Sequence, residues 1–255
     1  MKNIQPFTII HEDEDIIAIN KAPGISVCGD RWDKTGRDTS RERLDKLIAE
    51  TLSVEKLFTV HRIDRETSGL VVFAKNEETH RSLSLAFEGR DVKKKYIAVV
   101  CGRPSWRETY CDLPLVPDGN KRHMTVIDKF RGKESFTRFT LLGSAGNFSV
   151  LEAGPETGRT HQIRVHAAAI GFPVVCDSLY GKDKPVMLSD FKKGWRGDLL
   201  TEKPLLARLG LHALEISLPI HAESRCTLYA PVPKDMSVLV KQIEKANSIV
   251  FSSKI

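Results

Sequence analysis

Residues 61–75, HRIDRETSGLVVFAK, carry more information about the fold than any other part of this chain. Asp64 lies between two arginines, and small residues separate it from a short apolar, β-branched run. Such a run predicts a buried strand over 70–74, so Asp64 is expected at the mouth of a core element. A nearby arginine favours the ionised carboxylate, which can act as a nucleophile or a base. The alternative is a structural aspartate that pairs with Arg62 or Arg65 or caps a turn.

The same stretch resembles the catalytic motif of the RluA family of pseudouridine synthases, HRLDxxTSGLL, with Ile63 in place of a leucine. The sequence GRTHQIRVH at 158–166 matches the family's second signature without a change. Further segments resemble family motifs in the family's order: 16–24, 94–102, 171–181 and 209–213. Ala22 and Cys176 depart from the family pattern, the latter where glycine is usual. The matches extend from Ile16 to about Leu218, which is nearly the whole chain.

The fold class follows from the element pattern and is made specific by the resemblance. Strands outnumber helices and most connections are short, which predicts an α+β chain with a largely antiparallel sheet. The resemblance implies the pseudouridine synthase fold, a mixed and mostly antiparallel sheet in two halves with a central active-site cleft. Residues 1–255 are then one catalytic domain with a core of about 8–246. Because the opening motif begins by Ile16, no preceding S4-type RNA-binding domain is expected.

The resemblance also implies an activity, the isomerisation of uridine to pseudouridine in structured RNA. Asp64 falls on the nucleophile, which attacks C1′ or C6 or deprotonates the ribose, and Arg164 falls on the arginine that pairs with it. Tyr96 falls on the tyrosine that stacks on the flipped uracil, and Arg62 on the arginine that assists base flipping. Without the resemblance, Arg164 would be interpreted as a structural ion-pair residue, Tyr96 as a packed strand residue and Arg62 as a surface residue. No redox step occurs in this reaction, so no cofactor is expected.

Composition agrees with RNA as the partner without requiring it. The net charge is +6 and the isoelectric point is about 9.0. Clustered cations suit a surface that follows phosphates; they occur at 90–95, 121–123, 129–133 and 192–196. The five cysteines form no Cys-x-x-Cys pair, so neither a disulfide framework nor a zinc site is expected. Without an apolar run of membrane-spanning length or a targeting signal, the cytoplasm is expected. The protein is also expected to be a monomer.

Local patterns predict the elements. Strands are expected over 70–74, 95–101, 135–142, 148–153, 209–218 and 225–230, and in two pieces over 7–20 around the acidic turn Glu12–Asp15. Helices are expected over 40–52, 77–87, 160–170 and 234–247. Asn76 is the predicted N-cap of the second helix and Thr160 of the third, with Gly89 and Gly171 at their ends. Residues 21–38 and 182–208 are predicted loops.

Two other functions compete with the isomerase. One is an RNA-binding protein on the same scaffold that performs no catalysis. The other is a hydrolase with a Ser68-His61-Asp64 triad, which lacks the Gly-x-Ser-x-Gly elbow typical of such enzymes. His161 and His166 lie five apart on an expected helix and thus on different faces, so they make poor shared metal ligands. The RNA target stays open between tRNA and rRNA, with a compact stem-loop such as a tRNA arm suiting a lone catalytic domain.

Overall fold

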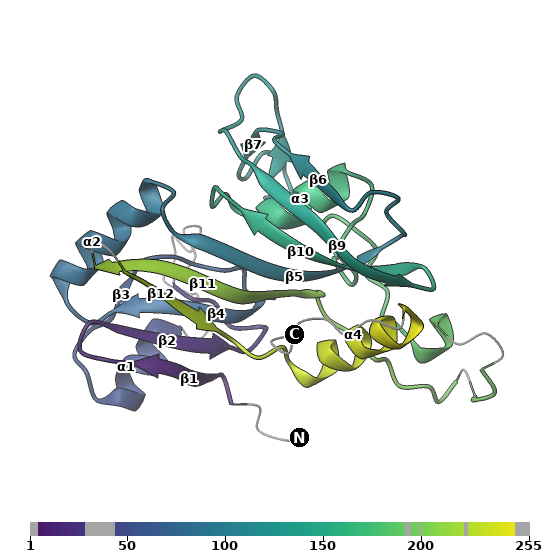
Figure 1. Ribbon diagram of the computed structural model, residues 1–255, viewed down its shortest axis with the longest axis horizontal. Helices are drawn as coiled ribbons and strands as arrows, with labels where there is room; N and C mark the ends of the chain where they lie inside the picture. Colours follow the sequence, from purple (N-terminus) through teal and green to yellow (C-terminus); the bar gives the residue numbers. More distant parts are fainter. Residues whose placement is uncertain (1–4, 29–43, 192–194, 199, 222–223, 248–255) are drawn as a thin grey trace. The chain divides into compact units, whose positions relative to one another are not determined.

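The computed structural model describes residues 5–28, 44–191, 195–198, 200–221 and 224–247 (Figure 1). Two compact units form the chain. Unit 1 contains Met1–Lys94 and Ala213–Pro231, and unit 2 contains Lys95–His212 and Val232–Ile255. Each unit is therefore assembled from two separate stretches of sequence.

Unit 1 is built on a sheet whose strand order is β1-β2-β4-β11, with β3 beside β4 and β12 beside β11. The pairings β1 with β2, β2 with β4, β3 with β4, and β11 with β12 are antiparallel. Every residue of β4 is buried, as the apolar run predicts. The strand bounds are Phe7–Glu12 (β1), Ile16–Lys21 (β2), Phe58–Thr59 (β3), Ser68–Ala74 (β4), Leu211–His221 (β11) and Ser224–Tyr229 (β12).

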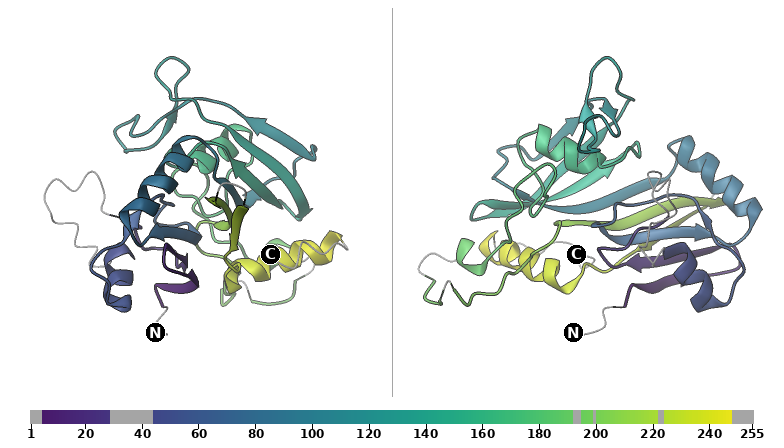
Figure 2. Two further views of the ribbon diagram at one scale, coloured as in Figure 1. Left: turned by 60° about the vertical axis from the view of Figure 1, so that its left-hand side comes forward. Right: turned by 180° about the vertical axis from the view of Figure 1, so that it is seen from behind.

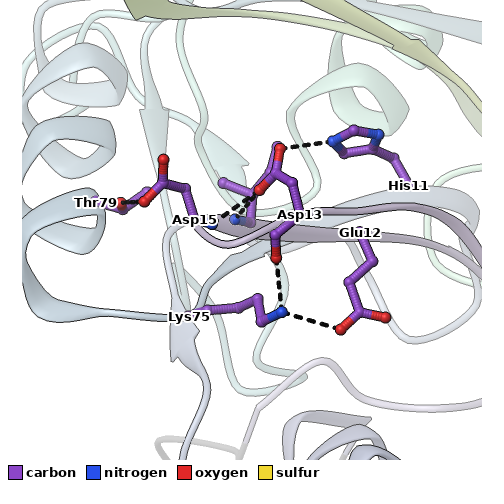
Figure 3. A network of polar contacts seen from close by, with 7 residues as sticks. His11, Glu12, Asp13, Asp15, Lys75 and Thr79 are labelled. Carbon is purple, nitrogen blue, oxygen red and sulfur yellow. Dashed lines mark hydrogen bonds and ion pairs between the residues drawn. The ribbon is translucent and has the colours of Figure 1, made fainter.

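The acidic turn between β1 and β2 is held by a polar network (Figure 3). Asp13 Oδ1 accepts hydrogen bonds from the backbone N–H groups of Asp15 and Ile16, at 2.9 and 2.7 Å. Lys75, which directly follows β4, donates from Nζ to Glu12 Oε1 at 3.0 Å and to the Asp13 carbonyl at 2.6 Å. Burial alone would raise the pKa of Asp13, but these backbone bonds and His11 bring it below its usual value. The turn is thereby fixed to the end of β4.

Two helices accompany this sheet, α1 (Leu44–Leu52) and α2 (Glu77–Glu88). Asn76 caps α2 as predicted, because its side chain accepts from the Thr79 N–H at 2.8 Å. Gly89 ends the helix, also as predicted. α2 packs on β3 and β4 (Figure 2). The predicted start of α1 at residues 40–43 lies outside the described residues.

Unit 2 has its own antiparallel strands, in the order β5-β10-β9-β6. The bounds are Lys93–Cys101 (β5), Glu108–Cys111 (β6), Leu115–Val116 (β7), Val126–Ile127 (β8), Thr137–Ala145 (β9) and Phe148–Pro155 (β10). β7 and β8 form a separate two-stranded sheet. The core contains Ala98, Phe139 and Leu151 from the strands, together with Ile163 and Ala167 from α3. The predicted antiparallel pair over 135–153 is thus confirmed, with slightly longer strands.

The third helix differs from its prediction at its start. α3 spans Gln162–Ala169, and its N-cap is His161 in the left-handed conformation, with no side-chain cap bond. The prediction of Thr160 as the cap is wrong, because the chain enters the helix through the left-handed backbone of His161. The Gln162 side chain instead accepts from the Arg159 N–H, which precedes the helix, at 3.0 Å. Gly171 ends the helix at φ +88°, as expected. α4 spans Lys234–Asn247, the same residues as predicted.

The expectation of an α+β chain with a mostly antiparallel sheet is confirmed. The predicted loop over 182–208 contains more structure than expected. It has a 3-10 turn at Leu188–Asp190, and Val186 pairs with Leu206 through an N–H group that donates at 2.8 Å. Residues 29–38 of the other predicted loop lie outside the described residues.

Gly69 in β4 should be intolerant of a side chain. Its φ is +114°, and an added Cβ would lie 2.3 Å from the Ala213 carbonyl oxygen. Gly24 is a matched control, because it has φ +89° with nothing within 4 Å of such a Cβ. Gly24→Ala is expected to cost about 1–2 kcal/mol of unfolding free energy from backbone strain. Gly69→Ala should cost about 1–3 kcal/mol more through the clash. Urea denaturation measures both, and equal losses would contradict the close approach.

Candidate active site

The segment that carries Asp64 connects β3 to β4 in unit 1. Asp64 is half-buried, whereas Arg62 and Arg65 on either side are exposed. The Thr67 N–H donates to the Asp64 carbonyl at 3.1 Å, which closes a turn directly before β4. Asp64 therefore lies where its sequence context predicts, on a tight turn at the start of a fully buried strand.

A buried lysine fixes this turn from the opposite side. Lys21 ends β2 and is only 1% exposed. Its ammonium group donates to the carbonyls of Arg65, Ala22 and Ile25 at 2.8, 2.9 and 2.9 Å. A buried charge is tolerated when all its donors are hydrogen-bonded, and three carbonyls match the three protons of an ammonium. In the sequence, Lys21 stands out only as part of the opening motif, with no role assigned to it.

Gly24 and Arg65 join the same two segments through a reciprocal pair of bonds. The Gly24 N–H donates to the Arg65 carbonyl at 2.8 Å, and Arg65 Nε donates to the Gly24 carbonyl at 2.9 Å. Arg65 thus anchors the turn and uses its Nε for the backbone. The opening motif and the Asp64 motif, about forty residues apart, form one hydrogen-bonded structure.

His61 serves the scaffold of the turn. Its Nε2 accepts from the Val72 N–H at 3.0 Å, which places its proton on Nδ1, and its ring stacks on Phe87 with centroids 4.9 Å apart. Burial, and next the positive charge of Lys94, lower the pKa of His61 to about 3. The hydrolase interpretation fails on these contacts, because the Nε2 that a base would use is occupied and Ser68 is 0% exposed.

Lys94 is a second lysine to which the sequence motifs gave no role. It stands two residues before Tyr96 at the start of β5, and burial lowers its pKa to about 8. Its charge acts on His61, so it lies beside the segment that carries Asp64. Tyr96 itself is half-buried, pairs in register with Ala153 of β10 and packs on the core of unit 2.

Arg164 is fixed within unit 2 by a buried carboxylate. Its Nε and Nη2 donate to the two oxygens of Asp177, both at 2.8 Å, and the two side chains are 6% and 0% exposed. Asp177 Oδ1 also accepts from the N–H groups of Leu179 and Tyr180 at 3.0 and 3.1 Å. Burial would raise the pKa of Asp177, but Arg164 and these backbone bonds lower it. The predicted pairing of Arg164 with Asp64 stays a prediction.

The residue before Asp177 departs from the family pattern and has an unusual backbone. Cys176 adopts φ +55°, a left-handed conformation that explains why glycine is usual there. Its thiol lies within hydrogen-bonding distance of the Lys184 and Leu206 carbonyls, at 3.3 and 3.6 Å. Burial raises the pKa of Cys176 to about 11, so the thiol stays protonated beside the backbone of Lys184 and Leu206.

The comparisons with known proteins agree with these motifs. The family described as RNA pseudouridylate synthase matches residues 15–169. The ribosomal large subunit pseudouridine synthase D of Zymomonas mobilis is 31% identical over 95% of this chain and 74% of its own length. The chain belongs to the RluA family of RNA pseudouridine synthases. It is an isomerase that acts on uridines of RNA.

Two further relatives of this pseudouridine synthase extend the comparison. The ribosomal large subunit pseudouridine synthase C of Vibrio parahaemolyticus is 33% identical over 94% of this chain and 70% of its own length. The solved structure of human RNA pseudouridylate synthase domain containing 1 superposes with a TM-score of 0.68. That structure is 24% identical and covers 91% of this chain and 87% of its own, which shows that the two share a fold.

The described part of this pseudouridine synthase contains neither a membrane-spanning helix nor a metal-binding cluster. Within it, no helix has the length and apolar character needed to cross a membrane. The same residues contain no group of three or more His, Cys, Asp or Glu side chains arranged to hold a metal ion.

The ion pairs Arg164–Asp177 and Arg208–Asp235 have the same geometry but differ in burial, so they test how burial changes the contribution of an ion pair to stability. Arg208 donates to both oxygens of Asp235 at 2.8 Å, as Arg164 does to Asp177, but Asp235 is 42% exposed. Asp177→Asn should cost about 3–5 kcal/mol of unfolding free energy, because Arg164 stays buried without a counter-charge. Asp235→Asn should cost about 0–1 kcal/mol. Urea denaturation at pH 7 measures both, and equal losses would contradict the role of burial.

The low pKa of His61 should make the stability of the synthase fall in mild acid. The folded-state pKa of His61 is about 3 and the unfolded value is 6.5, so only the unfolded chain gains a proton between these pH values. The full contribution is present above pH 6.5 and is lost as pH falls, by roughly 1 kcal/mol per pH unit. His61→Gln should flatten this slope between pH 6.5 and 4 in urea titrations. An unchanged slope would contradict the lowered folded-state pKa of His61.

Proposed function

We propose that this synthase converts specific uridines of structured RNA to pseudouridine with Asp64 as the nucleophile. The supporting observation is the network around Asp64, in which Lys21, Gly24 and Arg65 fix the backbone of the turn and the carboxylate stays half-buried. A held carboxylate at the start of a rigid strand is suited to repeated attack on one atom. In the reaction the N1–C1′ bond breaks and a C5–C1′ bond forms, while C5 loses a proton and N1 gains one.

The other three site residues are proposed to bind the substrate. Arg62 is exposed beside Asp64 and can reach a phosphate or the space left by the flipped nucleotide. Tyr96 offers a ring on which the uracil can stack. Asp177 holds the Arg164 guanidinium in one orientation through Nε and Nη2, which suits a cation that must keep a fixed position in the site. No cofactor is needed for the isomerisation, because it has no redox step.

The RNA target is proposed to be ribosomal or transfer RNA. Relatives that carry the name ribosomal large subunit pseudouridine synthase support ribosomal RNA. Residues 1–255 are proposed to work as one catalytic domain, as a monomer in the cytoplasm, where both kinds of RNA are available. Sedimentation with and without RNA would test the monomer.

Tritium release from RNA labelled at C5 of uridine tests the assignment of Asp64. Asp64→Asn keeps the size of the side chain but removes its negative charge, and should lower the release rate by more than about 1,000-fold. Glu66→Gln is the matched control, because Glu66 is exposed on the same turn and its Oε1 lies 3.8 Å from Arg65 Nε. It should keep nearly the native rate.

RNA binding by Asp64→Asn should persist in a filter-binding assay. Native-rate release by Asp64→Asn would reject the proposed nucleophile. Absence of release from the native protein on both ribosomal and transfer RNA, with binding intact, would favour the catalytically silent RNA-binding protein.

A further inference from the structure

A phenylalanine stands in solvent at the tip of a turn in unit 2. Phe130 is 99% exposed, the largest exposed fraction among the described large hydrophobic side chains. It follows β8 in the small β7–β8 sheet, which extends from the upper end of unit 2 in Figure 1. Single exposed apolar side chains are common on protein surfaces, so the meaning of Phe130 depends on its backbone and its surroundings.

The turn is built to hold this ring outward. Asp128 Oδ1 accepts from the backbone N–H groups of Phe130 and Arg131 at 2.9 and 3.0 Å, and the Gly132 N–H donates to the Asp128 carbonyl at 2.9 Å. A Cβ on Gly132 would lie 2.3 Å from that carbonyl oxygen, so the turn is closed as tightly as glycine allows. Phe130 is therefore exposed on an ordered backbone, with little conformational freedom left to lose on binding.

The base of the turn is anchored in the core. Leu115 is 0% exposed and exchanges two backbone hydrogen bonds with Lys133, at 2.9 and 3.0 Å. The neighbouring Leu113 carbonyl accepts from Ser135 Oγ at 2.7 Å and lies 2.9 Å from His166 Nε2. His166 belongs to α3, the helix that carries Arg164. The exposed ring is thus rigidly connected to the helix of a proposed substrate-binding residue.

The surroundings of Phe130 are positively charged. Residues 118–133 contain five lysines and arginines against two aspartates, a net charge of +3. All five cationic side chains are exposed: Lys121, Arg122, Lys129, Arg131 and Lys133. Arg131 pairs with Asp128 at 2.7 Å, so Lys129 and Lys133 are the neighbours of Phe130 that can contact an added anion. An exposed ring among cations is the pairing that single-stranded nucleic acid binds, through stacking and phosphate contacts.

We propose that residues 118–133, here called the Phe130 turn, bind the substrate RNA outside the catalytic turn. Phe130 stacks on an unpaired base while Lys129 and Lys133 contact the phosphates beside it. The proposal rests on the proposed function for the identity of the partner. It adds a recognition element that senses single-stranded or looped RNA, because a ring can stack on a base only where that base is unpaired.

Substitutions at Phe130 distinguish stacking of an aromatic ring on a base from non-specific hydrophobic binding. The probe is an unmodified ribosomal or transfer RNA transcript that the native protein modifies in the tritium assay. Phe130→Ala and Phe130→Leu should raise Kd and KM about 5-fold or more and leave kcat unchanged, because loss of one stacked base costs at least about that factor. Phe130→Trp should retain native binding. Leu85→Ala is the control, since Leu85 is a 60% exposed apolar residue on α2.

Salt dependence separates the ring from the cations. Lys129→Ala and Lys133→Ala should each reduce the slope of log Kd against log salt concentration by about 0.7–0.9, as expected for one lost phosphate contact. Phe130→Ala should leave that slope unchanged. In Phe130→Trp, RNA should protect the added emission from acrylamide quenching, measured against the native protein with its three tryptophans. Leu85→Trp should gain no such protection.

The outcomes also distinguish this proposal from the proposed function. Native Kd and KM in Phe130→Ala, or no protection of the tryptophan in Phe130→Trp, would overturn the RNA-binding role of the turn while catalysis stands. Absence of pseudouridine formation by the native protein would reject the proposed function instead, and the quenching experiment with transfer RNA would still decide whether the turn binds RNA. A thermal melt of each variant should match the native protein, because Phe130 makes almost no buried contact.

Discussion

The site depends on one buried ammonium group, that of Lys21. Its three hydrogen bonds to backbone carbonyls join the end of β2 to the turn that carries Asp64. A lysine that is 1% exposed is tolerated only with its donors satisfied, so the carbonyl of Arg65 cannot move away without leaving a buried charge unpaired. Because Arg65 directly follows Asp64, the requirement of the lysine becomes a restraint on the aspartate.

Unit 2 contains a corresponding arrangement in which the buried charge is negative. The carboxylate of Asp177 is fully buried and accepts hydrogen bonds from Arg164 and from two backbone N–H groups. The guanidinium is thereby held in one orientation. In both units a charged side chain that the proposed reaction needs is placed by a buried polar group that never has to meet the substrate. Rigid placement of this kind favours a reaction that requires only positioning and an ionised carboxylate.

Much of the fold followed from local sequence signals. The buried strand after Asp64, the Asn76 cap and the closing helix are fixed by residues within a few positions of each other, so short patterns suffice. The start of α3 was predicted wrongly for the converse reason. There the chain enters the helix through His161 in the left-handed conformation, and Gln162 is hydrogen-bonded to Thr137 of β9, which is distant in sequence.

The candidate site, like the fold, was predictable from the sequence in part and became visible in part only in the tertiary structure. Ordered motifs in the chain were enough to establish the family, the reaction class and Asp64 as the proposed nucleophile, because such motifs keep the residue types that the chemistry requires. Three features became visible only in three dimensions: Lys21 hydrogen-bonded to the Asp64 turn, Asp177 paired with Arg164, and the exposure of Phe130. Hydrogen-bond partners distant in sequence and the exposure of a side chain are fixed only when the chain has folded, because both depend on which segments come to lie side by side.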